Sequence, residues 1–128
     1  MKTLADLMHT DLLTVTPGTT VGQAVQVMGR EQVSSVLVLE GEELVGIFTE
    51  RDVVRALGAY FDAANHPVEE WMASPPITAT PGTTENEAVV LMKENTIRHL
   101  PVLDGGRLVG IVSMRDLTLE PAEETLPR

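Results

Sequence analysis

Two short stretches end an apolar run with a hydroxyl residue and place an aspartate three positions later. Thr49 and Asp52 lie within GIFTERD, and Ser113 and Asp116 lie within GIVSMRD. At the start of a helix such a pair forms a capping box, in which the side chains satisfy unpaired backbone N–H groups. The same position suits a nucleotide, since a helix N-terminus attracts phosphate and a carboxylate accepts both ribose hydroxyls. These residues alone leave both interpretations open.

Two details favour the ligand interpretation. The acid is Asp in both stretches, whereas a capping box prefers Glu or Gln. Arg51 and Arg115 directly precede the two acids and offer a cation to the same ligand. The indication is modest, because an exposed arginine on a helix is ordinarily only solvated.

The two stretches belong to a longer internal repeat. A shift of 64 residues aligns Thr14–Thr20 (TVTPGTT) with Thr78–Thr84 (TATPGTT), and Val38–Ile47 (VLEGEELVGI) with Val102–Ile111 (VLDGGRLVGI). About 19 of 46 aligned pairs are identical, without a gap, which indicates a duplicated structural unit.

Each copy has the pattern strand, helix, strand, strand, helix. Pro17–Gly18 suit a tight turn, after which Thr19 or Thr20 caps a helix whose buried stripe is predicted to be Val21, Ala24, Val25 and Met28. The other predicted elements of the first copy are Leu12–Thr16, Ser35–Leu39, Leu44–Phe48 and Glu50–Leu57. Those of the second copy are Ile77–Thr80, Thr84–Asn95, His99–Leu103, Leu108–Val112 and Met114–Leu119.

The predicted fold class is therefore α/β (α+β), with two β-α-β-β-α repeats packed face to face. Residues 1–64 are assigned to repeat 1, 65–120 to repeat 2, and 121–128 to a flexible acidic tail. Gly58–Pro67 is interpreted as the linker, and Leu4–Met8 and Val68–Met72 as matching lead-in helices. One unit of this size has a small core, so packing of two gives the duplication a structural purpose.

Composition narrows the classes of function. The 128 residues are 43% hydrophobic, contain no cysteine and carry a net charge of −10, with nine scattered Lys and Arg residues. This balance disfavours nucleic acid, whose affinity depends on basic side chains. No apolar run approaches the roughly 20 residues that span a bilayer, and the N-terminus resembles no secretory signal. We expect a cytoplasmic protein without a membrane or nucleic-acid partner.

No enzymatic chemistry is indicated. His9, His66 and His99 lack the spacing of a metal site, and neither a phosphate-binding G-x-x-x-x-G-K-[ST] loop nor G-x-G-x-x-G occurs. We expect no catalytic residues, no metal and no catalytic cofactor.

The ordered motifs resemble a tandem of cystathionine β-synthase (CBS) domains, also called a Bateman module. The resemblance rests on the TPGTT helix opening, RHLPVLD at Arg98–Asp104, the LVGI strand and the terminal T/S-x-x-D pair, and covers about Thr3 to Glu120. It implies two units about a pseudo-twofold axis, with clefts that bind AMP, ADP, ATP, S-adenosylmethionine or, in some members, NAD.

The resemblance also implies roles for individual residues. Asp52 and Asp116 would hold ribose hydroxyls, Thr49 and Ser113 would approach the phosphate, and Thr14 and Thr78 would line the adenine edge. Arg98 and His99 resemble a basic pair that meets phosphates, although His99 could instead be a hydrogen-bonded histidine at a strand edge. The predicted nucleotide-binding residues are Thr14, Thr49, Arg51, Asp52, Thr78, Arg98, His99, Pro101, Ser113, Arg115 and Asp116.

The copies differ where the basic pair occurs. The first has Ser34–Ser35–Val36–Leu37 where the second has Arg98–His99–Leu100–Pro101. We therefore predict one strong nucleotide site and one weaker or empty site.

The leading hypothesis is a regulatory sensor that binds an adenosine compound, most simply AMP, ADP or ATP, and reports occupancy to an effector protein by a conformational shift. The resemblance implies a homodimer. The alternative is a structural or oligomerisation module without a bound nucleotide.

Overall fold

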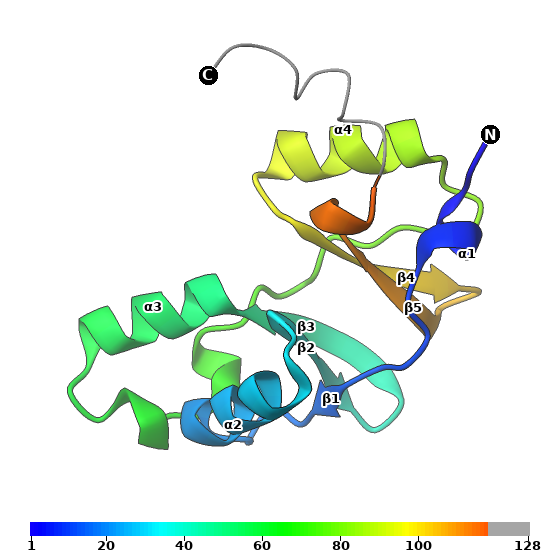
Figure 1. The fold of residues 1–128 in the computed structure, drawn as a ribbon. Helices are drawn as coiled ribbons and strands as arrows, with labels where there is room; N and C mark the ends of the chain where they lie inside the picture. The colour runs from blue at the N-terminus through cyan, green and yellow to red at the C-terminus, as the bar shows by residue number, and fades with distance from the viewer. Residues whose placement is uncertain (118–128) are drawn as a thin grey trace, which may run out of the picture. The chain divides into compact units, whose positions relative to one another are not determined.

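The computed structural model describes residues 1–117 and resolves into two compact units (Figure 1). One unit is continuous, Leu12–Pro76, and the other combines Met1–Asp11 with the described residues from Ile77 onward. Each repeat's strand pair therefore packs with the lead-in segment that precedes the other repeat. The predicted tail, 121–128, lies outside the described residues.

The continuous unit has a three-stranded sheet with the order β1–β2–β3. Strand β1 (Thr14–Val15) is parallel to β2 (Ser35–Glu40), which is antiparallel to β3 (Glu43–Thr49). Helix α2 (Val21–Glu31) follows the N-cap Thr20, whose hydroxyl accepts the Gln23 N–H. The Gln23 side-chain oxygen accepts the Thr20 N–H in return. The prediction of a helix capped at this position is confirmed.

Helix α2 buries a narrower stripe than the sequence predicts. Val21, Ala24 and Met28 enter a core formed with Val36, Val38 and Phe48, whereas Val25 is 40% exposed. The prediction for Val25 was wrong: the three buried residues lie close together around the helix axis, and Val25 lies at the edge of their stripe, where solvent reaches it.

Helix α3 extends from Glu50 to Ala59, two residues beyond the predicted end. The segment interpreted as a linker then contains the short 3₁₀ helix η1 (Ala63–Asn65), and the second lead-in is the 3₁₀ helix η2 (Val68–Glu70) rather than a longer helix. Ala63 and Val68 are fully buried, so this connection is part of the core of its unit.

The discontinuous unit repeats the plan with a smaller sheet. Strands β4 (His99–Asp104) and β5 (Arg107–Ser113) pair antiparallel, and α4 (Glu85–Asn95) begins after the cap Thr84. Instead of the predicted strand Ile77–Thr80, only Ala79 pairs with Val102, in a parallel bridge. The last predicted helix is the 3₁₀ turn η3 (Met114–Asp116), and Thr118–Leu119 lie outside the described residues.

The lead-in segments dock on equivalent strands. Helix α1 (Leu4–Leu7) is followed by His9, which exchanges backbone hydrogen bonds with Ile111 of β5, so blue and orange segments lie together in Figure 1. In the continuous unit, Ala73 makes the same two bonds with Ile47 of β3. Among residues 1–117 no helix has the length and apolar character to cross a membrane.

Candidate functional site

Both hydroxyl-x-x-Asp pairs form capping boxes at the end of a strand. Asp52 Oδ2 accepts the Thr49 backbone N–H at 2.9 Å and the Thr49 hydroxyl at 3.3 Å. Asp116 Oδ2 accepts the corresponding groups of Ser113 at 2.7 and 3.0 Å. The capping interpretation is thus confirmed in both copies, and each cap uses one carboxylate oxygen.

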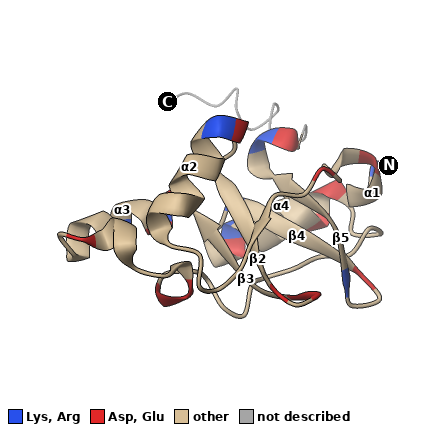
Figure 2. Cartoon of the chain, turned by 90° about the horizontal axis from the view of Figure 1, so that it is seen from below, with Lys and Arg blue, Asp and Glu red and all other residues tan. Residues whose placement is uncertain are grey.

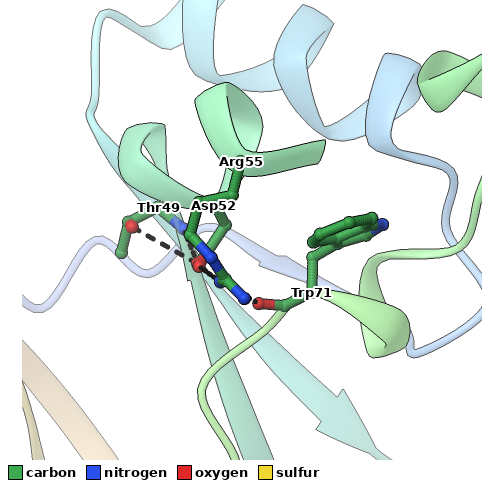
Figure 3. A network of polar contacts seen from close by, with 4 residues as sticks. All are labelled: Thr49, Asp52, Arg55 and Trp71. Atoms are coloured by element: carbon green, nitrogen blue, oxygen red, sulfur yellow. Dashed lines mark hydrogen bonds and ion pairs between the residues drawn. The ribbon is translucent and has the colours of Figure 1, made fainter. Parts of the chain in front are cut away.

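The other oxygen, Oδ1, faces a basic side chain in each copy. Arg55 Nη1 donates to Asp52 Oδ1 at 2.9 Å, as Figure 3 shows, and also contacts the Trp71 carbonyl at 3.4 Å. His9 Nε2 lies 3.0 Å from Asp116 Oδ1. Neither Arg55 nor His9 is among the site residues predicted from sequence.

The sequence did carry a signal for both residues. Under the 64-residue shift, Arg55 aligns with Leu119 and His9 aligns with Ala73. Each counter-ion therefore occupies a position at which the copies differ. A comparison of the two copies for shared residues therefore does not identify Arg55 or His9.

A third hydroxyl-x-x-Asp pair, not among the predicted site residues, occurs near the N-terminus. Thr3 and Asp6 form a capping box on α1, with the Thr3 N–H 3.1 Å from Asp6 Oδ2. Because this third pair begins a helix of only four residues, the pattern by itself indicates capping. The strand-end position and the basic side chain at Oδ1 distinguish the other two pairs.

Burial differs between the two acids. The Asp52 side chain is 10% exposed and that of Asp116 is 18% exposed. Burial by itself raises the pKa of Asp116, but hydrogen bonds from His9 and Ser113 outweigh it, so the pKa lies below the ordinary aspartate value. Asp116 is therefore ionised at neutral pH, in the form that accepts hydrogen bonds from hydroxyls.

The remaining predicted residues of the second repeat lie on neighbouring segments. His99 is the register partner of Ser113, and the Arg98 carbonyl accepts the Met114 N–H at 2.8 Å. Pro101 is fully buried in β4, so its side chain supports the strand, and its carbonyl accepts the N–H of Ala79, next to Thr78. Arg98 and Arg115 are exposed.

In the first repeat, Thr14 is exposed at the start of β1, opposite Leu37, and Arg51 is exposed on α3. Ser35 is the register partner of Thr49 and occupies the place that His99 has in the second repeat. Lys and Arg residues are spread along the ribbon rather than gathered on one element (Figure 2). In the described part of the chain no group of three His, Cys, Asp or Glu residues could hold a metal ion.

The CBS domain model matches the chain twice, over residues 4–59 and 68–123. The CBS domain-containing protein YhcV of Bacillus subtilis is 33% identical over 119 residues, which cover 93% of this chain and 85% of that protein. The chain belongs to the CBS-domain family and carries two copies of the domain. The resemblance inferred from the motifs is confirmed.

Solved structures share this fold. The CBS-domain containing protein ATU1752 of Agrobacterium tumefaciens has a TM-score of 0.86 at 28% identity, over 90% of this chain and 95% of that chain. A CBS domain pair of protein MJ0100, in complex with 5′-methylthioadenosine and S-adenosyl-L-methionine, has a TM-score of 0.83 at 24% identity, over 91% and 92%. CBSX2 in complex with AMP has a TM-score of 0.79 at 23% identity, over 98% and 100%.

CBS pairs also occur within larger enzymes. An inosine-5′-monophosphate dehydrogenase of Methanocaldococcus jannaschii is 34% identical over 119 residues, but this chain spans only 23% of its length. The shared segment is therefore the CBS pair, and the match assigns no catalytic activity to this chain.

Proposed function

We propose that this chain is a regulatory module that binds an adenosine compound, with Asp52 and Asp116 accepting the ribose hydroxyls. One observation carries the proposal: in both repeats the cap fixes the aspartate through Oδ2, while Oδ1 lies outside the cap, against a polar partner. A carboxylate held in this way is preorganised to accept hydrogen bonds, since ordering it on binding costs little.

The ligand class has two supports. Membership of the CBS family is one, and the pairing of acid and hydroxyl at a strand end is the other. The MJ0100 and CBSX2 structures hold adenosine compounds, and at 24% and 23% identity they establish the shared fold. Among AMP, ADP, ATP and S-adenosylmethionine, Arg98 and His99 favour a phosphate-bearing ligand in the second repeat.

A thermal-shift panel of AMP, ADP, ATP, S-adenosylmethionine and NAD tests the proposal. A ligand bound only by the folded state, at about 100 times its Kd, stabilises it by about 2.7 kcal/mol, so the melting temperature rises. Asp52→Ala and Asp116→Ala should each reduce the rise. Asp6→Ala is the matched control, because it removes a capping aspartate outside the site. A panel without any rise would favour the structural-module alternative.

We also propose that the module forms a homodimer. Val54 and Leu57 on α3, with Phe61 just beyond it, expose large apolar side chains, 69%, 61% and 109% respectively, at a helical spacing. Sedimentation of the wild type and of Leu57→Glu tests this, because a charge in a buried apolar interface should shift the population to monomer. An unchanged sedimentation coefficient for Leu57→Glu would show that α3 does not form the dimer interface.

A further inference from the structure

Both carboxylate oxygens of Asp116 already have hydrogen-bond partners within the protein. Its Oδ2 accepts two hydrogen bonds from Ser113, and a carboxylate oxygen has two lone pairs. Its Oδ1 already pairs with His9. A ribose diol that makes two hydrogen bonds to this acid must therefore either break the cap or compete with His9.

His9 is placed for such competition by its backbone. Its N–H donates to the Ile111 carbonyl at 2.8 Å, and its own carbonyl accepts the Ile111 N–H at 3.0 Å. The imidazole is nevertheless 63% exposed, so water can reach it and it can leave Oδ1 without disturbing the core. The backbone bonds hold the residue beside the acid whether or not the ring is paired.

The first repeat has a counter-ion of a different kind. Arg55 stays charged at any physiological pH and is also held by the Trp71 carbonyl and ring, whose centroid lies 5.5 Å from the guanidinium carbon. Histidine changes its charge between about pH 5 and pH 8. A cationic imidazole adds Coulomb attraction to the hydrogen bond that a ring N–H makes with a carboxylate, so it holds the carboxylate more strongly than the neutral ring does.

Several charged or titratable groups lie near the His9–Asp116 pair, among them His99 on β4, the register partner of Ser113. Asp116 on η3 faces its ring, and Arg115 is the adjacent residue on that element. On its own segment, Asp6 is engaged by Thr3, and Asp11 follows two positions later. His9 contacts Asp116 directly, so protonation of the ring acts on that carboxylate.

We propose that His9 is a pH-dependent latch on Asp116: the imidazolium competes with a ribose hydroxyl for Oδ1 more strongly than the neutral ring does, so protonation of His9 weakens ribose binding. This rests on the proposed function, in which Asp116 binds ribose. The second repeat then binds adenosine compounds more tightly as pH rises, while the Asp52 site, with its permanent cation, does not respond.

Calorimetric titration with adenosine at about pH 5.5 and about pH 8 tests the latch. Adenosine is the probe because it lacks a phosphate, whose own ionisation near pH 6 would confuse the result. An ion pair with one exposed partner contributes about 0.2–1 kcal/mol, so affinity at the Asp116 site should rise by a factor of about 1.4 to 5 at the higher pH.

Three variants sharpen the test. His9→Gln should bind at both pH values as tightly as the wild type does at the higher one, whereas His9→Lys should bind weakly at both. His66→Gln, which alters a histidine in the other unit, should keep the wild-type dependence. Circular dichroism confirms that each variant folds.

The outcomes separate the two proposals. Adenosine binding with the same pH dependence in the wild type and His9→Gln would overturn the latch and leave the proposed function standing. Binding of AMP without any binding of adenosine would also overturn the latch, because the ribose contact would then contribute too little to be gated. No binding of either compound at either pH would overturn both.

Discussion

The aspartates of the two repeats share a cap and differ in their counter-ions. Asp52 and Asp116 receive hydrogen bonds of similar length from Thr49 and Ser113, but Oδ1 of the first meets an arginine three residues away and Oδ1 of the second meets a histidine 107 residues away. The cap is needed to begin the last helix of each repeat, so its residues match. The counter-ion has no such role, and the copies differ there.

The largest expected effect concerns the lead-in contacts, which are alike in both units. A Cβ on Gly46 would lie 2.4 Å from Met72 Sδ and 3.1 Å from the Ala73 carbonyl oxygen; one on Gly110 would lie 2.5 Å from Met8 Sδ. Gly46→Val and Gly110→Val should each lower the free energy of unfolding by about 1–3 kcal/mol, as overpacking does. Urea denaturation measures this.

The control for these glycine variants is Gly29→Ala. Nothing lies within 4 Å of a Cβ at that helical position, so alanine should raise stability by up to about 1 kcal/mol. Equal loss of stability in all three variants would show that the methionine contacts are not responsible. A smaller loss in Gly110→Val than in Gly46→Val would reflect the rigid carbonyl beside Gly46.

The next effect compares the two acids without ligand. Asp52→Ala leaves the Thr49 N–H without its acceptor in the more buried setting, so it should cost about 1–2 kcal/mol of unfolding free energy. Asp116→Ala should cost less, since its side chain is more exposed. Denaturation curves of the two variants check the order, and a larger loss for Asp116→Ala would contradict it.

A smaller effect tests the predicted inequality of the two nucleotide sites. Replacing both Arg98 and His99 with serine gives the second repeat the residues that Ser34 and Ser35 supply in the first. Affinity for AMP at the stronger site should fall about three- to tenfold, because the two basic groups contribute about 1 kcal/mol to binding of the phosphate. Calorimetry that finds two equal sites in the wild type would refute the inequality.

The smallest effect contrasts the two paired histidines. His66 lies between two acids, with Nδ1 2.9 Å from Glu70 and Nε2 3.1 Å from Asp62, and its ring stacks on Tyr60. The hydrogen bonds to Glu70 and Asp62 raise the pKa of His66. The resulting stability is complete below the ordinary pKa of about 6.5 and is lost as pH rises through the folded value.

The melting-temperature difference between the wild type and His66→Gln should therefore shrink as pH rises from about 5 to about 9. Measurement of both proteins across this range checks the sign. A melting-temperature difference that grows with pH would mean that the neutral His66 ring stabilises the folded state more than the protonated ring does.

Much of the fold could be predicted from sequence because the pattern of each element occurs in both copies of the repeat. The TPGTT turns located the start of α2, and the apolar runs placed α4 and the hairpins to within about two residues. The first strands were predicted too long, since β1 covers only Thr14–Val15 of the predicted Leu12–Thr16, and Ile77–Thr80 supplies a single bridge at Ala79. Such short pairings depend on the neighbouring strand rather than on local composition.

The site could be predicted only in part. Local spacing identified Thr49–Asp52 and Ser113–Asp116, because a cap is made by neighbouring residues. His9 reaches Asp116 through tertiary pairing with Ile111, which no local pattern reveals. Whether Thr14, Arg51 and the other predicted residues contact a ligand stays a prediction.

The exchange of lead-in segments sets an order on folding during synthesis. Leu12–Pro76 is continuous, so that unit can form as soon as its last residue leaves the ribosome. Met1–Asp11 are made before this unit, yet their strand partner Ile111 is made about 100 residues later, roughly 5–20 s at ordinary translation rates. Throughout that interval Leu4, fully buried in the finished protein, has no core to enter.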